Sequence, residues 1–335
     1  DLEALRLDIS RDAVSAYMNV MRTEALVRIR QQQVDLTGTN LELAELRRSV
    51  GAAGAAEVHR WAAELATARA GYIDALSNRS MSWRRLSRIL DEPLTTRWSP
   101  KEPEIAAAIG VLGGADDAAL LDTQNGYDRL STTLVEDCLE RSPELAALTA
   151  AITAQERRFA AAKRATYSPT VAASADLSQI LVKDTSGGID LGELADLIPE
   201  FDDTSWQVGV AAGLPIVTGG ANKARRIKAQ EELFALRTDQ RNAEEKLGQR
   251  TLSALDTATA SWATISLRRQ AAEAASQTLE LVRDAYGRGA ASILDLLDAQ
   301  NNALTAELAA ETSVFDFLDD WAEVRRSVAG LPVEP

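Results

Sequence analysis

The chain has 335 residues, only 5% of which are aromatic, and alanine and leucine are its most frequent residues, a composition typical of long helices. Its 50 acidic side chains outnumber its 36 basic ones, and the resulting formal net charge of −14 argues against a surface that neutralises nucleic-acid phosphates. With one cysteine and one histidine, the chain can build neither a disulfide framework nor a Cys/His metal cluster, so we expect no nucleic-acid partner, cofactor or metal.

An internal repeat organises the sequence. A shift of 238 residues places Gly51 on Gly289 and Glu57 on Asp295. The same shift places Ile29, Leu36 and Leu43 on Leu267, Ala274 and Leu281. Self-similarity of this kind predicts two related structural units.

The first unit, residues 1–94, reads as a helical hairpin. Apolar residues recur every seven positions from Ile29 to Val50, which is the spacing of a coiled-coil seam. A glycine-containing turn follows, with Gly51 and Gly54, and a second long helix then runs back.

A connector and a further helix follow the first hairpin. Residues 95–133 contain prolines and glycines and are predicted to link the two repeats. Residues 134–166 are predicted to form a helix that leads into a pair of strands. The first unit has no counterpart of this upstream region, so we expect an N-terminal segment that holds it to be missing.

Residues 167–219 change from the helical period to strict alternation. Two segments of about ten residues, one around Val171 and one around Val208, place apolar residues on one face and small or polar residues on the other. A tilted strand of that length crosses a bilayer, and such alternation lines a water-filled barrel. A half-buried hairpin in a soluble domain would show the same pattern. If the hairpin is membranous, two strands cannot close a barrel and the chain must oligomerise; the charged residues 180–204 would then form an extracellular loop.

Residues 220–335 read as the second, longer hairpin. No proline interrupts the segment from Ala221 to Tyr286, which as a helix would extend about 100 Å. Its turn contains Gly287 and Gly289. Helices of this length need packing partners along their whole extent.

Three segments, 167–171, 214–220 and 286–300, resemble the strand entry, the strand exit and the hairpin turn of the TolC family of outer membrane efflux proteins. The resemblance extends from about residue 10 to residue 332. It implies a mainly α fold of long antiparallel coiled-coil hairpins in two tandem repeats, plus a β-hairpin that contributes to a trimeric transmembrane β-barrel. Family protomers give four strands to that barrel, whereas this chain shows one pair.

The function that the resemblance implies is passive export rather than catalysis. The chain would be the outer membrane channel of a tripartite efflux or type I secretion system in a Gram-negative bacterium. As a homotrimer in outer membrane lipid, with most of its mass in the periplasm, it would work with a periplasmic adaptor (membrane fusion) protein and an inner-membrane transporter. The alternative is a periplasmic coiled-coil adaptor or scaffold, because such proteins also use long helical hairpins.

The resemblance also assigns residues to the periplasmic entrance. Asp295 and Asp298 match the paired entrance aspartates of the family, and a three-fold axis would gather them into acidic rings that select cations. The other interpretation is a solvated pair at a helix start, stabilised by the helix dipole. Glu57 and Tyr286 match residues that hold the closed tip, whereas Ala291 stands where some members have a gate-locking arginine.

Overall fold

The computed structural model describes residues 2–96, 118–165, 167–179, 204–214 and 218–330. The chain divides into two compact units, one formed by Asp1–Ala147 with Arg241–Pro335 and the other by Leu148–Gln240. No helix within the described ranges combines the length and the apolar composition that crossing a membrane requires.

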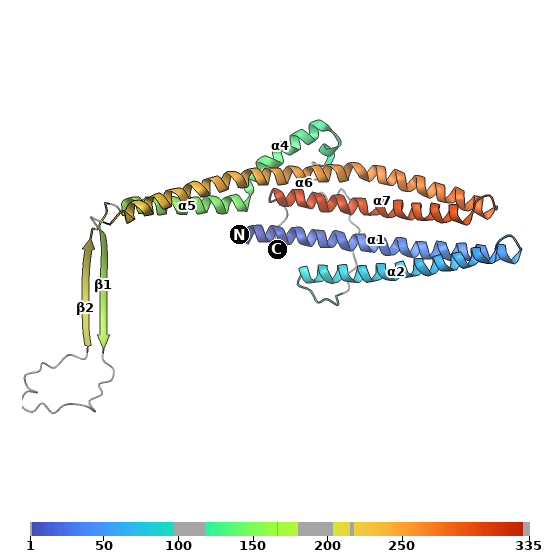
Figure 1. Ribbon diagram of the computed structural model, residues 1–335, viewed down its shortest axis with the longest axis horizontal. Coiled ribbons are helices and arrows are strands. Elements are labelled where there is room, and N and C mark those ends of the chain that lie inside the picture. The colour runs from blue at the N-terminus through green and yellow to red at the C-terminus, as the bar shows by residue number, and fades with distance from the viewer. Residues whose placement is uncertain (1, 97–117, 166, 180–203, 215–217, 331–335) are drawn as a thin grey trace, which may run out of the picture. The chain divides into compact units, whose positions relative to one another are not determined.

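Two long helical hairpins lie side by side in the first unit, with their turns at the same end (Figure 1). One hairpin consists of α1 (Leu2–Ser49) and α2 (Ala55–Ile89). The other consists of α7 (Ile293–Ser327) and the part of α6 (Ala221–Gly287) that follows Gln240. α6 alone has 67 residues. The predicted fold of long helical hairpins is therefore confirmed.

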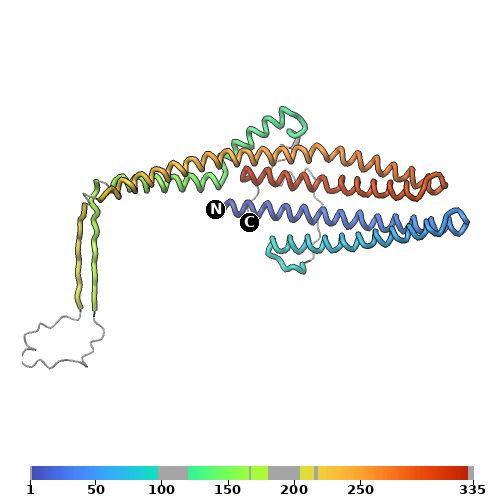
Figure 2. Tube along the Cα trace, viewed as in Figure 1, coloured from blue at the N-terminus to red at the C-terminus, as the bar shows by residue number. Residues whose placement is uncertain are grey.

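α1 packs against α2 of its own hairpin and also against α7 of the other hairpin, as the traces in Figure 2 show. Trp262 of α6 packs with Phe317 and Trp321, near the end of α7, in an aromatic core. The ring centroids of Trp262 and Phe317 are 4.9 Å apart, and those of Phe317 and Trp321 are 6.2 Å apart. Cys138 is buried in the same cluster, where it acts as a small apolar side chain. The same cluster includes Leu7, Met18 and Met21 of α1, so apolar burial joins the two repeats.

The region before the strands holds two helices where the sequence predicted one over residues 134–166. After a short 3₁₀ turn, η1 (Ala118–Asp122), helix α4 runs over Gln124–Arg141 and helix α5 over Pro143–Arg164. The break falls at Ser142, whose hydroxyl accepts a hydrogen bond from the backbone N–H of Leu145 (3.3 Å). A proline is tolerated in the first turn of a helix because its missing N–H would have no intrahelical partner there.

In the second unit, α5 and the first part of α6 contact each other through polar side chains, among them Arg237 and Glu156 at 2.7 Å. They lead into an antiparallel hairpin of β1 (Thr170–Gln179) and β2 (Thr204–Gly213). The predicted strand pair is confirmed. The predicted loop 180–204 lies outside the described residues except for Thr204.

The register of the hairpin places the apolar residues on one face. Leu177 pairs with Trp206 and Ala175 with Val208, whereas the pair formed by Asp176 and Gln207 faces the other way. All of β1 and nearly all of β2 are exposed. Over the described residues, the apolar face therefore packs against no core of its own chain, unlike the face of a half-buried hairpin.

Candidate functional site at the hairpin turns

Glycines end the outgoing helix of each hairpin in the same conformation. Gly51 and Gly289 have φ angles of +78° and +76°, in the left-handed region that strongly favours glycine. In the first turn, the N–H of Ala52 donates to the carbonyl of Arg47 (2.7 Å), and Ala290 makes the equivalent bond in the second turn (2.8 Å). This pattern is the Schellman motif. The repeat found in the sequence thus extends to the backbone of the two turns.

The other two glycines assigned to the turns have ordinary backbone angles. Gly54 is the N-cap of α2, with φ −87° and ψ 161°, and no side chain caps that helix. Gly287 is the last residue of α6, and its φ is not positive. The repeat places Gly54 on Ser292, which is the N-cap of α7. The two return helices therefore begin differently, one with a side-chain cap and one without.

Asp295 and Asp298 lie on the first turns of α7, and both are exposed. Asp295 completes a capping box: its carboxylate accepts from the N–H of Ser292 (2.9 Å), while its own N–H donates to the Ser292 hydroxyl (3.2 Å). The bond from the Ser292 side chain, together with that from its backbone, lowers the pKa of Asp295. Asp298 accepts from the amide of Asn302 (3.2 Å). The role of this pair at a channel entrance stays a prediction.

Glu57 and Tyr286 are brought together from opposite hairpins. Tyr286, near the end of α6, is only 1% exposed, and its hydroxyl donates to the carboxylate of Glu57 at the start of α2. Burial raises the pKa of Tyr286, and the bond to Glu57 raises it further. The phenol therefore stays protonated and remains a donor at neutral pH.

Two further residues, Arg47 and Trp61, complete this contact. The indole N–H of Trp61 donates to the Tyr286 hydroxyl (3.1 Å), and the two rings meet edge to face with centroids 6.3 Å apart. The guanidinium of Arg47 lies 4.5 Å from the centre of the Tyr286 ring and donates to its backbone carbonyl (2.5 Å). We call Arg47, Glu57, Trp61 and Tyr286 the tip cluster.

Sequence reasoning assigned no contact at the tip to Arg47 or Trp61. Their partner, Tyr286, lies 239 and 225 residues away along the chain, so no local spacing indicates the contact. The available signal was the repeat, because it shows that both hairpins turn at equivalent positions and so present neighbouring residues to each other.

A seam of polar residues joins α1 to α7, farther from the hairpin turns than the tip cluster. The buried side chains of Thr37, Asn40 and Gln300 form a layer in which Gln300 donates to Thr37 (2.7 Å) and accepts from Asn40 (3.2 Å). Ion pairs continue along the same two helices. Arg28 pairs with Glu311 (2.6 Å), and three further salt bridges follow. These are Arg22 with Asp316 and with Asp319, and Arg11 with Glu323.

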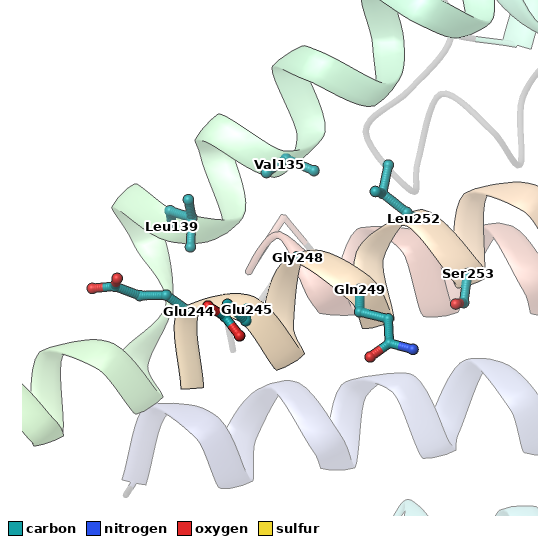
Figure 3. Close-up of a pocket in the computed structure, with 8 residues that line it drawn as sticks. All are labelled: Val135, Leu139, Glu244, Glu245, Gly248, Gln249, Leu252 and Ser253. Carbon is teal, nitrogen blue, oxygen red and sulfur yellow. The ribbon is translucent and has the colours of Figure 1, made fainter. Parts of the chain in front are cut away.

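A shallow cavity of about 560 Å³ lies between α4 and α6 (Figure 3). Val135 and Leu139 line it from α4, and Gly248 and Leu252 line it from α6. Its wall is mostly apolar and its two acids, Glu244 and Glu245, are adjacent residues on one helix. The part of the chain that the structure describes has no group of three or more His, Cys, Asp or Glu side chains that could hold a metal ion.

Residues 134–329 match the outer membrane efflux protein family. A relative, the outer membrane efflux protein BepC of Brucella suis, is 29% identical over 148 residues, which cover 44% of this chain and 30% of BepC.

Solved outer membrane channels have the same fold. The channel OprN superposes with a TM-score of 0.76 at 19% identity, over 100% of this chain and 68% of OprN. CmeC of Campylobacter jejuni gives a TM-score of 0.69 at 16% identity, over 98% of this chain and 64% of CmeC. The chain therefore spans about two thirds of the length of these channels and matches under a third of BepC. The match to the family covers more than half of the chain and confirms the resemblance seen in the sequence: the chain belongs to the outer membrane efflux protein family.

Proposed function

We propose that this chain is one protomer of a homotrimeric outer membrane channel. The channel passively conducts solutes from the periplasm to the exterior as the exit duct of a tripartite efflux or type I secretion system. The observation that carries this proposal is the combination of two long, joined helical hairpins with a β-hairpin that is exposed on both faces.

The exposed β-hairpin supports assembly in a membrane. An apolar face with no core beneath it needs either lipid or another chain to cover it. Two strands leave unpaired backbone groups at both edges, and in lipid each such group costs several kcal/mol, so further strands, from the same protomer or from neighbouring ones, must pair with these edges. Residues 167–219 would form the barrel contribution, with 180–204 as an extracellular loop.

The helices supply the tunnel. Residues 1–94 and 220–335 would form its periplasmic wall, with 95–133 at the equator and 134–166 leading to the barrel. Asp295 and Asp298 would line the entrance at the turns, and the tip cluster would hold the two hairpins of each protomer together there. The energy for export would come from an inner-membrane transporter that a periplasmic adaptor connects to the tip.

None of the relatives described above is a periplasmic adaptor, and they favour the channel over that alternative. The function of a channel also explains why the β-hairpin exposes apolar residues, which an adaptor working in water would have to cover.

The test is the mass of the detergent-extracted, full-length protein by light scattering, with conductance recorded from the same preparation in planar bilayers. A trimer that conducts ions is the expected result. A monomer or dimer without conductance would overturn the proposal and favour a soluble helical scaffold.

A further inference from the structure

Positive charge gathers in the second unit, where the helices lead into the strands. Residues 157–164 of α5 and residues 223–228 of α6 contain four basic residues each and no acid, although the chain as a whole has a net charge of −14. All eight basic side chains are exposed; they are Arg157, Arg158, Lys163, Arg164, Lys223, Arg225, Arg226 and Lys228. Like charges repel, so something must hold them together.

Two buried amides hold the charged stretches side by side. The side chain of Gln155 in α5 donates to the backbone carbonyl of Ala229 (3.3 Å), and that of Asn222 in α6 donates to the carbonyl of Ala165 (3.4 Å). These two hydrogen bonds join α5 to the first part of α6 at both ends of the charged stretches (Figure 1). Each stretch extends about 10 Å or less along its helix, so the charges of the two helices act together.

The acids next to this region are already engaged by side chains of the chain itself. Glu156 pairs with Arg237 (2.7 Å). Glu232 accepts from Gln155 (2.8 Å) and lies 3.8 Å from Lys228. Four of the basic side chains form no salt bridge or side-chain hydrogen bond with any residue that the structure describes, and we call these the junction cations: Lys163, Arg164, Lys223 and Arg226.

The junction cations border the exposed apolar face of the β-hairpin. Tyr167, 64% exposed, lies between α5 and β1, whereas Trp206, 75% exposed, lies at the far end of the hairpin opposite Leu177. Aromatic residues at both ends of an apolar strand are typical of a segment that spans a bilayer, with the rings at the depth of the lipid headgroups. The junction cations follow the aromatic residue at the helical end, so they would lie level with the lipid phosphates.

A phospholipid fits both features of this region at once. Its phosphate can bind the cations, and an arginine can form two parallel hydrogen bonds to it. Its acyl chains can cover the neighbouring apolar face of the strands. Lysine and arginine side chains are long enough to keep their charges in the headgroup region while their methylene groups contact apolar surface. A soluble anion would neutralise the charges but would leave the apolar face uncovered.

We propose that the junction cations bind the anionic headgroups of phospholipids in the membrane leaflet on the side of the helices. This inference rests on the proposed channel and names a lipid class that each protomer binds where its strands meet its helices. A zwitterionic headgroup has the same phosphate but also an ammonium group, which the cations repel. The site should therefore prefer phosphatidylglycerol to phosphatidylcholine.

Lipid retention by the full-length protein tests this preference. The trimer is incubated in neutral detergent with equal amounts of dioleoyl-phosphatidylglycerol and dioleoyl-phosphatidylcholine, and the lipids that co-elute on gel filtration are quantified. The wild type should retain more phosphatidylglycerol. Changing all four junction cations to Gln should lower the ratio of the two lipids at least about tenfold, because each cation near a membrane surface adds to the attraction. Lys163→Arg with Lys223→Arg keeps the charge and should keep the preference.

A matched control removes the same charge from exposed positions on α4 and on the rest of α6. It combines Arg129→Gln, Lys246→Gln, Arg269→Gln and Arg283→Gln. The lipid ratio should remain that of the wild type. An equal fall in this control would show that net charge, rather than a site, attracts the lipid, and would overturn the proposal.

Salt provides a test that needs no substitution, so it holds even where the fourfold variant fails to assemble. Raising the sodium chloride concentration from about 0.1 M to about 1 M shortens the Debye length from about 10 Å to about 3 Å. Most of the preference of the wild type for phosphatidylglycerol should then be lost. A preference that is unchanged in high salt would contradict binding by the junction cations.

The remaining outcomes separate the lipid site from the channel. A conducting trimer that retains both lipids equally overturns the lipid site and leaves the channel standing. If the fourfold variant keeps the lipid ratio but shifts the reversal potential in planar bilayers, the junction cations line the conduit and the lipid site is overturned. A monomer without conductance overturns both proposals.

Discussion

Glu57 and Asp295 occupy equivalent positions in the two repeats, yet their carboxylates bond to different partners. Asp295 bonds to Ser292, the N-cap of its own helix. The equivalent cap of α2 is Gly54, which has no hydroxyl, and the carboxylate of Glu57 instead accepts from Tyr286. Because Gly54 has no side chain with which Glu57 could form a capping box, the Glu57 carboxylate can bond to Tyr286 and join the two hairpins.

Tyr286→Phe tests how much the hydroxyl stabilises the tip. The aromatic ring that the Arg47 guanidinium contacts is kept. The Tyr286 hydroxyl is lost, and it is the shared hydrogen-bond partner of the Glu57 carboxylate and of the buried Trp61 indole N–H. We expect the free energy of unfolding to fall by about 1–3 kcal/mol, and the channel to spend more time open in bilayer recordings.

The matched control is Tyr127→Phe, which also removes a tyrosine hydroxyl that donates to a carboxylate, that of Asp256 (2.5 Å), but on α4, outside the tip cluster. It should leave the conductance unchanged. Equal open times in wild type and Tyr286→Phe would show that the tip cluster has no part in closing the channel.

Tyr127 also predicts a pH dependence. The hydrogen bond to Asp256, followed by burial, raises the pKa of Tyr127 to about 12. A phenol with a raised pKa in the folded state contributes stability that is fully present below its unfolded pKa of about 10 and is lost as the pH rises through about 12. The alkaline loss of stability should therefore be smaller in Tyr127→Phe than in wild type. Phenolate absorbance should show one fewer late-titrating group; an unchanged titration curve would contradict the assignment.

The residues of the tip were predictable only in part. The turn glycines Gly51 and Gly289 follow from the repeat, since both stand where a long helix must stop. The pairing of Glu57 with Tyr286 needed the family resemblance, because nothing local to either residue indicates a partner in the other hairpin.

At the scale of the element, the two turns depend on one backbone conformation. Gly289→Ala places a side chain at φ +76°, which costs about 1–2 kcal/mol. Gly54→Ala, at φ −87° and with no atom within 4 Å of the new Cβ, should change stability by less. Thermal unfolding followed by circular dichroism measures both. A larger loss for Gly54→Ala than for Gly289→Ala would contradict the role given to the left-handed turn.

The buried layer of Thr37, Asn40 and Gln300 predicts a second effect on the α1–α7 pair. Gln300→Leu leaves the Asn40 amide and the Thr37 hydroxyl buried without their partner, so we expect a loss of about 1–3 kcal/mol in denaturant unfolding. Replacing all three together, by Thr37→Val, Asn40→Leu and Gln300→Leu, should recover that stability but weaken the helix register, as polar layers specify register in coiled coils. If the free energy of unfolding of the triple variant is lower than that of Gln300→Leu, the prediction that this layer specifies the helix register is contradicted.

Periodicity identifies an element but not its neighbours. Ile29 and Leu267 belong to the same heptad pattern, yet Ile29 is buried and Leu267 is exposed. Ile29 is buried because α1 packs against both α2 and α7. The break between α4 and α5 was visible in the sequence as a serine followed by Pro143, a helix-start signal that the helical period around it obscured.

At the scale of the whole molecule, the β-hairpin shows why assembly lies beyond one chain's sequence. Alternation from Val171 onward correctly predicts two strands and one apolar face. In the proposed channel, that face would be covered by lipid and by other copies, and the sequence of one chain does not show which of them lies against it. The proposed trimer is therefore tested best by a property that no single protomer possesses.

Cation selectivity is such a property. Asp298→Asn should reduce the preference for cations, because three copies would remove three carboxylates from one ring while the Asn302 contact can be kept. Asp295→Asn should also reduce the preference for cations. Because it alters the capping box of α7 as well, its helix content is compared with that of wild type before the change in selectivity is assigned to charge. Asp74→Asn, an exposed control in α2, should leave selectivity unchanged. Reversal potentials under a salt gradient measure all three variants, and an unchanged value for Asp298→Asn would leave the two aspartates as a solvated helix-start pair.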